Sequence, residues 1–432
     1  MLAEVRVWGR TIGAVSWDRA RDCALFEYDA AFVSSGIEVA PLTMPLGAGV
    51  FRFPELDRST FHGLPGLLAD SLPDAFGTAM IDAWLARQGR TSASFTPIER
   101  LCYTGTRGMG ALEFAPATGP RPTQGTPLAI DALVQLASEI LAHRDTLHGD
   151  FSDTARDRAL RNILRVGTSA GGARAKAVIA WNPSTHEVRS GQITPGDGFE
   201  HWLLKFDGVS GNKDRELDDP QGYGAIEFAY ANMARAAGIT MSECRLLEEN
   251  GRRHFMTRRF DRTADGHKLH MQTLGAIAHY DFRLAGAYGY EQLLQLIRRL
   301  GLGMATVEEQ FRRMVFNVVA RNQDDHVKNI TFLMDKSGRW SLAPAYDVIY
   351  RYNPTGEWTS VHQMTVNGAR DGFRRDDLRA VAASAGMRPR RAESIIAEVQ
   401  AAVTWWPEFA EGAGVDATQM AEIGRHHRLA LL

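Results

Sequence analysis

Residues 321–334, RNQDDHVKNITFLM, are the part of the sequence that most restricts what the chain can fold into. Two aspartates, a histidine, a lysine and an asparagine fall within six positions, and an apolar run typical of a β-strand follows them directly. Such a crowd of ionisable groups is expected at a metal site, in a catalytic loop, or in an ordinary polar turn. The rest of the sequence has to distinguish these three interpretations.

A site for a transition metal fits the segment poorly. Zinc and iron sites need several His or Cys ligands at defined spacing, and His326 is the only such residue here. A hard cation such as Mg²⁺ takes oxygen ligands instead, and one or two protein groups often suffice when substrate phosphates supply the rest. Asp324 and Asn329 offer such oxygens in the spacing D-x-x-x-x-N, which is that of the protein kinase catalytic loop. The spacing alone is weak evidence, because it often arises by chance.

A second carboxylate follows a predicted β-hairpin. The strand NITFLMD, the turn KSGR and the stretch WSLAPAYDVIY place Asp347 at the end of this hairpin. Phosphotransferases bring two metal-binding groups together in this way, and Asp347 would then hold the metal that bridges the ATP phosphates. The alternative interpretation is that Asp347 caps a turn and Asp324 caps a helix end.

Further features upstream occur in the order found in kinases. VGTSAGGARAKAVIAW is a Gly-rich turn suited to presenting backbone N–H groups to phosphates, although it is neither a Walker A nor a G-x-G-x-x-G motif. Lys205 follows in an apolar strand, where it either lies at an edge or needs an anionic partner such as ATP. Glu227, on a predicted helix, could hold that lysine or face solvent. HFMTRRFDR then resembles a strand and a connector that could contact adenine. The combination favours the catalytic loop.

The organisation of the chain supports two or three domains, since domains hold about 100–200 residues and the chain has 432. A β-rich unit with a helix at LPDAFGTAMIDAWLARQG ends before the linker APATGPRPTQGTP. A helix at LAIDALVQLASEILAHRD leads into a second β-rich region, and helices dominate from about residue 270. The clearest helix is expected to begin with a Thr306/Glu309 capping box. Its apolar stripe consists of Val307, Phe311, Met314, Val315 and Val318.

Composition excludes several classes of protein. A net charge of -2 provides no global field for nucleic acid or an anionic membrane surface. Cys23, Cys102 and Cys244 are far apart, which argues against a disulfide framework and against a thiolate zinc site. The N-terminal residues alternate like a strand rather than a signal peptide, and no apolar run reaches the ~18 residues of a membrane span. We therefore expect a cytoplasmic protein without membrane contact.

The set of motifs resembles the HipA family, the serine/threonine kinase toxins of bacterial toxin–antitoxin modules. The matching stretches are LPGLLADSLPDAFG, GMGALEF, TSAGGARAK, HWLLKFD, RRFDR, NQDDHVKNITFLM and LAPAYDV, which together cover nearly the whole chain. The resemblance implies an α+β, protein-kinase-like fold. It further implies an N-terminal β-rich subdomain at 1–118, a mixed N-lobe with the Gly-rich loop at 127–257, and an all-helical C-lobe at 258–432.

The resemblance also implies roles for individual residues. Asp324 matches the catalytic aspartate and Lys205 the lysine that holds the ATP phosphates, while Asn329 and Asp347 match the Mg²⁺ ligands. Ser169 matches the serine of the Gly-rich loop that such kinases autophosphorylate, although it could simply be a small residue in a tight turn. Further contacts to ATP are expected from Gly171, Gly172, Ala173, Phe260, His326 and Lys328.

Some of these roles have alternatives. His326 and Lys328 could stabilise the transferring phosphoryl group or could pin the loop through hydrogen bonds. Thr168, beside Ser169, could also accept phosphate.

The function that the resemblance implies is an ATP- and Mg²⁺-dependent protein kinase toxin. Its expected substrate is an aminoacyl-tRNA synthetase, and its expected partner is a HipB-like helix-turn-helix antitoxin through which it meets DNA indirectly. Two other functions remain open: a small-molecule phosphotransferase of kinase-like fold, and a non-enzymatic co-repressor that binds the antitoxin. The N-terminal unit and TSAGGARAK speak against the first, and the intact set of Lys205, Asp324, Asn329 and Asp347 speaks against the second.

Overall fold

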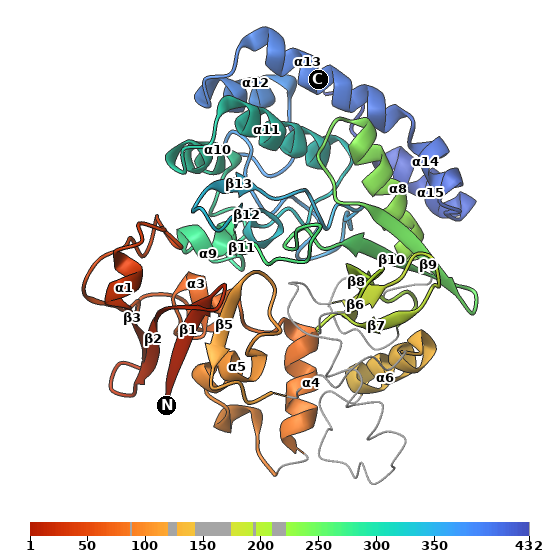
Figure 1. Cartoon of the computed structure of the whole chain (residues 1–432). Coiled ribbons are helices and arrows are strands. Elements are labelled where there is room, and N and C mark those ends of the chain that lie inside the picture. The colour runs from red at the N-terminus through yellow and green to blue at the C-terminus, as the bar shows by residue number, and fades with distance from the viewer. Residues whose placement is uncertain (87–88, 120–127, 143–173, 193–195, 210–221, 432) are drawn as a thin grey trace.

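The computed structural model describes residues 1–86, 89–119, 128–142, 174–192, 196–209 and 222–431. These residues form an N-terminal β-rich unit, a second unit built on another sheet, and a larger, mainly helical unit (Figure 1). The first two units lie side by side, and the helical unit lies across both of them. None of the described helices is long and apolar enough to cross a membrane.

The N-terminal unit is built on a five-stranded antiparallel sheet in the order β4-β3-β2-β1-β5. Side chains on β1 alternate between buried and more exposed positions, because one face of the sheet packs on the core of the unit. The strands are β1 Leu2–Val7, β2 Arg10–Asp18, β3 Cys23–Tyr28, β4 Val50–Phe51 and β5 Leu112–Ala115. The helices are α1 Ala30–Val33, α2 Arg58–Phe61, α3 Gly66–Ala69, α4 Ala75–Ala86, η1 Ser92–Ser94 and α5 Pro97–Thr104.

The second unit carries a five-stranded antiparallel sheet in the order β7-β6-β8-β10-β9. Every residue of the inner strand β6 is buried, since elements cover both faces of the sheet. The strands are β6 Lys176–Trp181, β7 Val188–Ser190, β8 Glu200–Lys205, β9 Cys244–Glu249 and β10 Arg252–Arg258. The helices are α6 Ile130–Ala142 and α8 Tyr223–Ala236.

Two helices connect the units by sharing cores with a neighbour. The α4 side chains Phe76 and Met80 belong to the same buried cluster as Ile179 of β6. Tyr230 of α8 packs in the cluster of the helical unit together with Phe311. The boundaries expected at 118 and 257 stay a prediction, and the described cores run across both of them.

The helical unit contains a small sheet that an all-helical lobe would lack. Its order is β11-β12-β13, so the predicted hairpin of β12 and β13 is present and gains one strand from the segment after the connector. The strands are β11 His270–Thr273, β12 Thr331–Met334 and β13 Trp340–Leu342. The helices are α9 Leu274–Ala278, α10 Tyr290–Arg299, α11 Met304–Val319, η2 Val327–Asn329, α12 Arg375–Ser384, α13 Pro389–Thr404, α14 Trp406–Gly412 and α15 Ala417–His426.

Helix α11 forms the centre of this unit, and the whole predicted apolar stripe is buried in its core. The predicted capping box is wrong, because the helix begins at Met304 and Gly303 occupies the N-cap position. Glu309 is used elsewhere: it pairs with Arg313 at 2.8 Å and accepts a hydrogen bond from the Thr240 amide at 3.0 Å. The contact with Thr240 depends on a segment 69 residues away in sequence, which local capping rules do not consider.

Candidate active site

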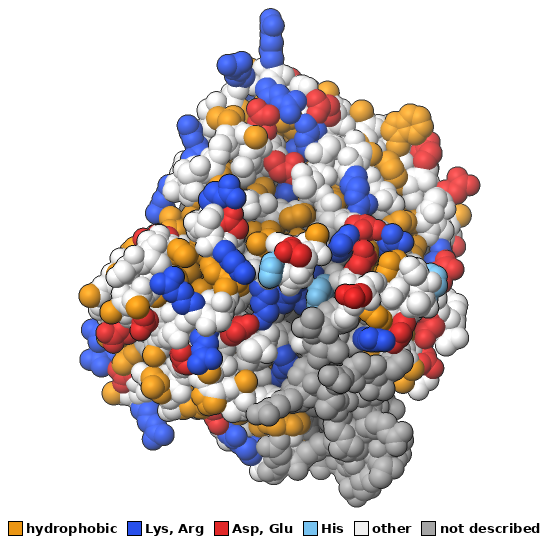
Figure 2. Space-filling view, in the orientation of Figure 1, with side chains coloured by type: hydrophobic (Ala, Val, Ile, Leu, Met, Phe, Trp, Pro, Cys, Tyr) orange, Lys and Arg blue, Asp and Glu red, His pale blue; other side chains and the backbone are white. Residues whose placement is uncertain are grey.

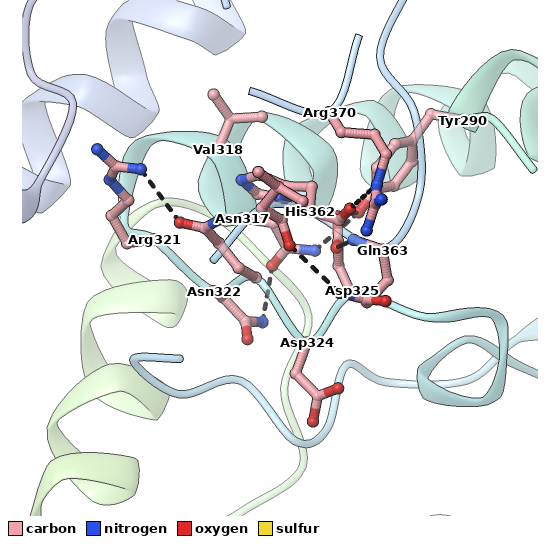
Figure 3. Close-up of polar contacts among 12 residues, drawn as sticks. Tyr290, Asn317, Val318, Arg321, Asn322, Asp324, Asp325, His362, Gln363 and Arg370 are labelled. Carbon is pink, nitrogen blue, oxygen red and sulfur yellow. Dashed lines mark hydrogen bonds and ion pairs between the residues drawn. The ribbon is translucent and has the colours of Figure 1, made fainter. Parts of the chain in front are cut away.

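The loop after α11 carries Asp324 to an accessible position. Arg321 takes a left-handed backbone conformation (φ 58°) just past the helix and turns the chain back. The Asp324 side chain is 30% exposed and points away from the buried network shown in Figure 3. Its Oδ1 accepts a hydrogen bond from the Trp358 indole at 3.1 Å. Asn329 Nδ2 donates to the Asp324 carbonyl oxygen at 2.8 Å, so the D-x-x-x-x-N loop is closed on itself.

The neighbouring Asp325 points into the protein and anchors this loop. Its Oδ2 accepts hydrogen bonds from the Tyr290 hydroxyl at 2.8 Å and from His362 Nδ1 at 2.9 Å, and its Oδ1 accepts one from the Gln363 amide at 2.8 Å (Figure 3). Burial alone would raise the pKa of this carboxyl, but the contacts with His362, Tyr290 and Gln363 outweigh it and lower the pKa. Asp325 is therefore a structural carboxylate directly beside an accessible one.

The network around this carboxylate reaches two other parts of the unit. Asn317 Nδ2 donates to the Tyr290 hydroxyl at 3.0 Å, and Asn322 Nδ2 donates to Asn317 Oδ1 at 2.9 Å, which ties the loop to α11. From the C-terminal segment, Arg428 Nη1 lies 3.0 Å from His362 Nε2. Because a guanidinium can only donate, His362 accepts at Nε2 and donates from Nδ1.

His326 and Lys328 both rest on the ring of Phe282. The His326 and Phe282 ring centroids are 5.7 Å apart, and Lys328 Nζ lies 4.6 Å from the Phe282 centroid. His326 Nδ1 accepts from the Lys328 amide at 3.3 Å, and the Tyr346 hydroxyl donates to the Lys328 carbonyl oxygen at 2.6 Å. These contacts favour the role of pinning the loop, while the Lys328 side chain stays partly exposed.

Lys205 joins the second sheet to the segment of the helical unit that carries Asp347. It is the last residue of β8, is 6% exposed, and its Nζ contacts Glu227 Oε1 at 2.5 Å and also Asp347 Oδ1. The predicted contact with Glu227 is thus present. Burial would lower the pKa of this ammonium, but the two carboxylates outweigh it and raise the pKa. Burial likewise opposes ionisation of Asp347, yet Lys205 and then Lys176 lower its pKa to about 2.

Two more cations lie beside Lys205. Lys176 faces Lys205 across the β6–β8 pair, and its Nζ is 3.5 Å from Asp74 Oδ2 of the N-terminal unit. Arg174 Nη1 contacts the second oxygen of Glu227 at 3.2 Å. Figure 2 shows basic side chains, with histidines beside them, gathered near the centre of one face where the three units meet. This concentration of buried cations is suited to an anion with several charges, such as a nucleotide polyphosphate.

Asn329 and Asp347 line one cavity of about 30 Å³, which also borders the loop carboxylate Asp325. Because Asn329 donates its Nδ2 to the loop, its side-chain oxygen is the atom able to bind a cation. Asp347 is ionised, and its left-handed backbone (φ 52°) holds it at the end of the turn after β13. One carboxylate and one amide oxygen fit Mg²⁺ that shares its other ligands with phosphates and water. Among the described residues, no group of three or more His, Cys, Asp or Glu is arranged to hold a metal.

Phe260 lies in the connector after β10, where adenine contacts were expected. Its ring centroid is 5.4 Å from that of Tyr346, so the connector touches the segment that carries Asp347. The positions expected in the Gly-rich loop lie outside the described residues, and they are Ser169, Gly171, Gly172 and Ala173.

Two family models match this chain. The HipA N-terminal domain matches residues 3–115, and the HipA-like C-terminal domain matches residues 168–406, more than half of the chain. The chain belongs to the HipA family.

Two relatives agree with this assignment. A relative from Sinorhizobium fredii, Y4mE, whose name marks it as a candidate kinase, is 31% identical over 363 residues, which are 80% of this chain and 76% of the relative. A chain in the solved complex of HipA, HipB and operator DNA from Shewanella oneidensis MR-1 superposes with a TM-score of 0.67 at 17% identity, covering 98% of this chain and 94% of that one. The fold is therefore the kinase-like α+β fold of HipA proteins, as predicted.

Several residues of this HipA site were missed by sequence reasoning. Trp358 contacts the carboxylate of Asp324 from a stretch without periodic pattern. Asp74 reaches the lysine pair from the N-terminal unit, where its stretch served only as a family motif. His362, which holds Asp325, stands in a loop. No local signal in the sequence connects these positions to the loop at 321–329.

Proposed function

We propose that this HipA-family chain is an ATP- and Mg²⁺-dependent protein serine/threonine kinase and acts as the toxin of a toxin–antitoxin module. The observation that carries the proposal is the placement of Lys205, which contacts both Glu227 and Asp347, while Asp347 shares a cavity with Asn329 of the D-x-x-x-x-N loop. This is the arrangement that phosphoryl transfer needs, because the protein mainly positions phosphates and offsets their charge.

In this reaction Asp324 is the catalytic residue. The hydroxyl oxygen of a protein Ser or Thr forms a bond to the γ-phosphorus, the bond from that phosphorus to the β–γ bridging oxygen breaks, and ADP leaves. Asp324 orients the hydroxyl and accepts its proton. The Trp358 indole holds Oδ1, and within the described part of the chain Oδ2 has no hydrogen bond and can take the proton.

The other residues hold the nucleotide. Lys205 would bind the α- and β-phosphates, and Asn329 and Asp347 would hold Mg²⁺, whose charge would offset that of the phosphates. Lys205 contacts Asp347 in the described structure, so an Asp347 that held the cation would give up this contact. Phe260 and the backbone of Gly171, Gly172 and Ala173 complete the pocket by family resemblance, with His326 and Lys328 shaping the loop.

The proposal for the biological target rests on family resemblance. We propose that the substrate is an aminoacyl-tRNA synthetase, whose phosphorylation would inhibit translation, and that Ser169 is autophosphorylated. The partner would be a HipB-like antitoxin, and contact with DNA would be indirect through it. Support comes from family membership and from the similarity to a chain of a complex that contains HipB and operator DNA.

The test combines chemistry with toxicity. Purified wild-type protein and Asp324→Asn are incubated with Mg²⁺-ATP, and phosphate on Ser169 is sought by mass spectrometry of peptides. Both proteins are also induced in bacteria without an antitoxin. We expect phosphate and growth arrest with the wild type only. Equal growth arrest by both proteins, with no phosphate on either, would contradict the kinase and favour a binding function.

A further inference from the structure

Lysine is rare in this chain, and its distribution is uneven. The sequence holds six lysines among 49 basic residues, and three of them, Lys176, Lys205 and Lys328, lie at the candidate site. Lys205 contacts Glu227 and Asp347, and Lys328 lies over the Phe282 ring. Lys176 forms an ion pair with Asp74 of the N-terminal unit.

The geometry around Lys176 is that of a buried ion pair. Its side chain is 5% exposed and that of Asp74 is 4% exposed, with 3.5 Å between Nζ and Oδ2. The charged groups that face this ammonium from the described residues are Asp74 before α4, Lys205 on β8 and Asp347 after β13. Burial and the like charge of Lys205 lower the pKa of Lys176, while Asp74 and Asp347 oppose that change.

Asp74 uses its two oxygens for different purposes. Oδ1 accepts a hydrogen bond from the Gly77 amide at 2.6 Å and so caps the first turn of α4. Oδ2 faces the lysine, and within the described residues no hydrogen-bond partner completes its shell. Since Phe76 and Met80 of α4 share a core with the second sheet, the carboxylate is held in place on that sheet. An N-cap alone would explain Oδ1 and leave the position of Oδ2 unexplained.

Asp70, four residues earlier, offers an internal comparison. Its carboxylate is also buried, but it faces the helical unit, accepting from the Thr273 amide at 2.7 Å and the Thr273 hydroxyl at 3.0 Å. Residues 70–74 therefore bind one kinase lobe at each end. Only the Asp74 end reaches the lysine pair that faces Asp347.

We propose that Asp74 is a positioning residue of the nucleotide site: it holds the Lys176 ammonium beside Lys205, so that two lysines face the phosphates together. The N-terminal unit then completes the site of the two kinase lobes. This inference rests on the proposed function, since it assigns the phosphates of the nucleotide as the group that the two lysines face.

The first experiment uses protein without nucleotide. With lysine labelled with ¹³C at Cε, the six lysines give a simple NMR spectrum, and Lys176 is assigned by the loss of its signal in Lys176→Arg. Asp74→Asn keeps an oxygen that can cap α4 but removes the charge. We expect its Lys176 signal to titrate about one pH unit or more below that of the wild type, and Asp74→Glu to restore most of the difference.

Asp70→Asn is the matched control, because it removes an equally buried carboxylate from the same segment without touching Lys176. We expect its Lys176 titration to equal that of the wild type. An unchanged titration in Asp74→Asn, or an equal change in Asp70→Asn, would overturn the inference. If Asp74→Asn does not fold, Asp74→Ser keeps a capping hydroxyl and decides the same question.

The second experiment separates this inference from the proposed function. Calorimetry measures Mg²⁺-ATP binding from pH 7 to 9, where we expect the affinity of Asp74→Asn to fall about tenfold relative to the wild type as Lys176 loses its proton. Wild-type protein that binds no nucleotide would contradict the proposed function but would leave the lysine titration as an independent result. Wild-type binding with the same pH dependence in Asp74→Asn would contradict the inference alone.

Discussion

The two sides of the candidate site are held by different kinds of contact. On the side of the helical unit, the loop at 321–329 is fixed by hydrogen bonds of mostly neutral groups around Asp325, including Tyr290, His362 and Asn317. On the side of the second sheet, cations and carboxylates from three units alternate, with Lys205 placed between Glu227 and Asp347. The hydrogen-bonded frame around Asp325 forms one side of the site, and the balanced set of charges around Lys205 forms the other.

The difference indicates which side responds to a ligand. Neutral hydrogen bonds around a buried carboxylate gain nothing from a nearby anion, so we expect the catalytic loop to have the same geometry with and without nucleotide. Under the proposed function, the balanced set of buried charges would rearrange on binding a polyphosphate, because Asp347 cannot pair with Lys205 and hold a metal ion through the same oxygen. In the proposed reaction the hydrogen-bonded loop would orient the substrate hydroxyl, and the charged side chains would exchange partners when the nucleotide binds.

The largest expected effect concerns Asp324. Asp324→Asn keeps an oxygen for the Trp358 indole but cannot take a proton from the substrate. We expect phosphotransfer to fall on the order of 10² to 10⁴-fold, while the affinity for Mg²⁺-ATP and the unfolding temperature stay at wild-type values. Initial rates with radiolabelled ATP, calorimetry and thermal unfolding measure the three quantities. A rate within a few-fold of the wild type would remove Asp324 from the catalytic role.

The next effect concerns the neighbour, Asp325, and should be mainly on stability. In Asp325→Asn an amide group would face the Tyr290 hydroxyl and the His362 Nδ1–H, both of which donate to the carboxylate. A buried group left without its partner costs about 1–3 kcal/mol of unfolding free energy. Urea unfolding at neutral pH measures this cost, and Asp324→Asn is the matched control at an accessible position.

The Asp325→Asn variant should also change how the free energy of unfolding depends on pH. The pKa of Asp325 is lowered on folding, so the stability that its ionisation confers is fully present above the ordinary value of 3.8 and is lost as the pH falls below it. Wild-type stability should therefore fall more steeply than that of Asp325→Asn between about pH 4 and pH 2. Parallel curves for the two proteins would mean that Asp325 does not hold the frame as an anion.

Features that are local in sequence were predictable, and contacts between distant segments were not. Spacing predicts Asp324, Asn329 and Asp347 as site residues, because a loop, a hairpin and a carboxylate follow each other directly along the chain, and the structure places Asn329 and Asp347 on one cavity. The apolar stripe of α11 was also predictable, since helix periodicity is local. Contacts that join distant segments were not: nothing local to Asp74 or His362 indicates the lysine pair or the buried carboxylate that each one meets.

The roles of lysines depended on context in the same way. A charged residue inside an apolar strand needs a partner or an exposed edge, so the sequence alone singles out Lys205. Lys176 begins a strand that is buried throughout, but in the sequence it stands only at the end of the family motif TSAGGARAK. Its importance comes from the antiparallel register that places it opposite Lys205, and register is set by pairing across the sheet rather than by neighbours in sequence.

The smallest expected effect tests the charged side through Glu227. Its two oxygens hold Lys205 and Arg174, and Gln in its place can accept from only one cation while its amide group faces the other. Lys205 would then depend more on Asp347, which competes with Mg²⁺ for that carboxylate. We expect Glu227→Gln to weaken ATP binding about threefold to tenfold when Mg²⁺ is present, as for the loss of one net hydrogen bond. The change without Mg²⁺ should be smaller.

Glu200→Gln is the control, since Glu200 lies on the same strand as Lys205 but pairs with the partly exposed Arg258 at 3.5 Å. Equal loss with and without the metal would mean that Glu227 only supports the fold, and the two sides of the site would then differ less than their contacts indicate.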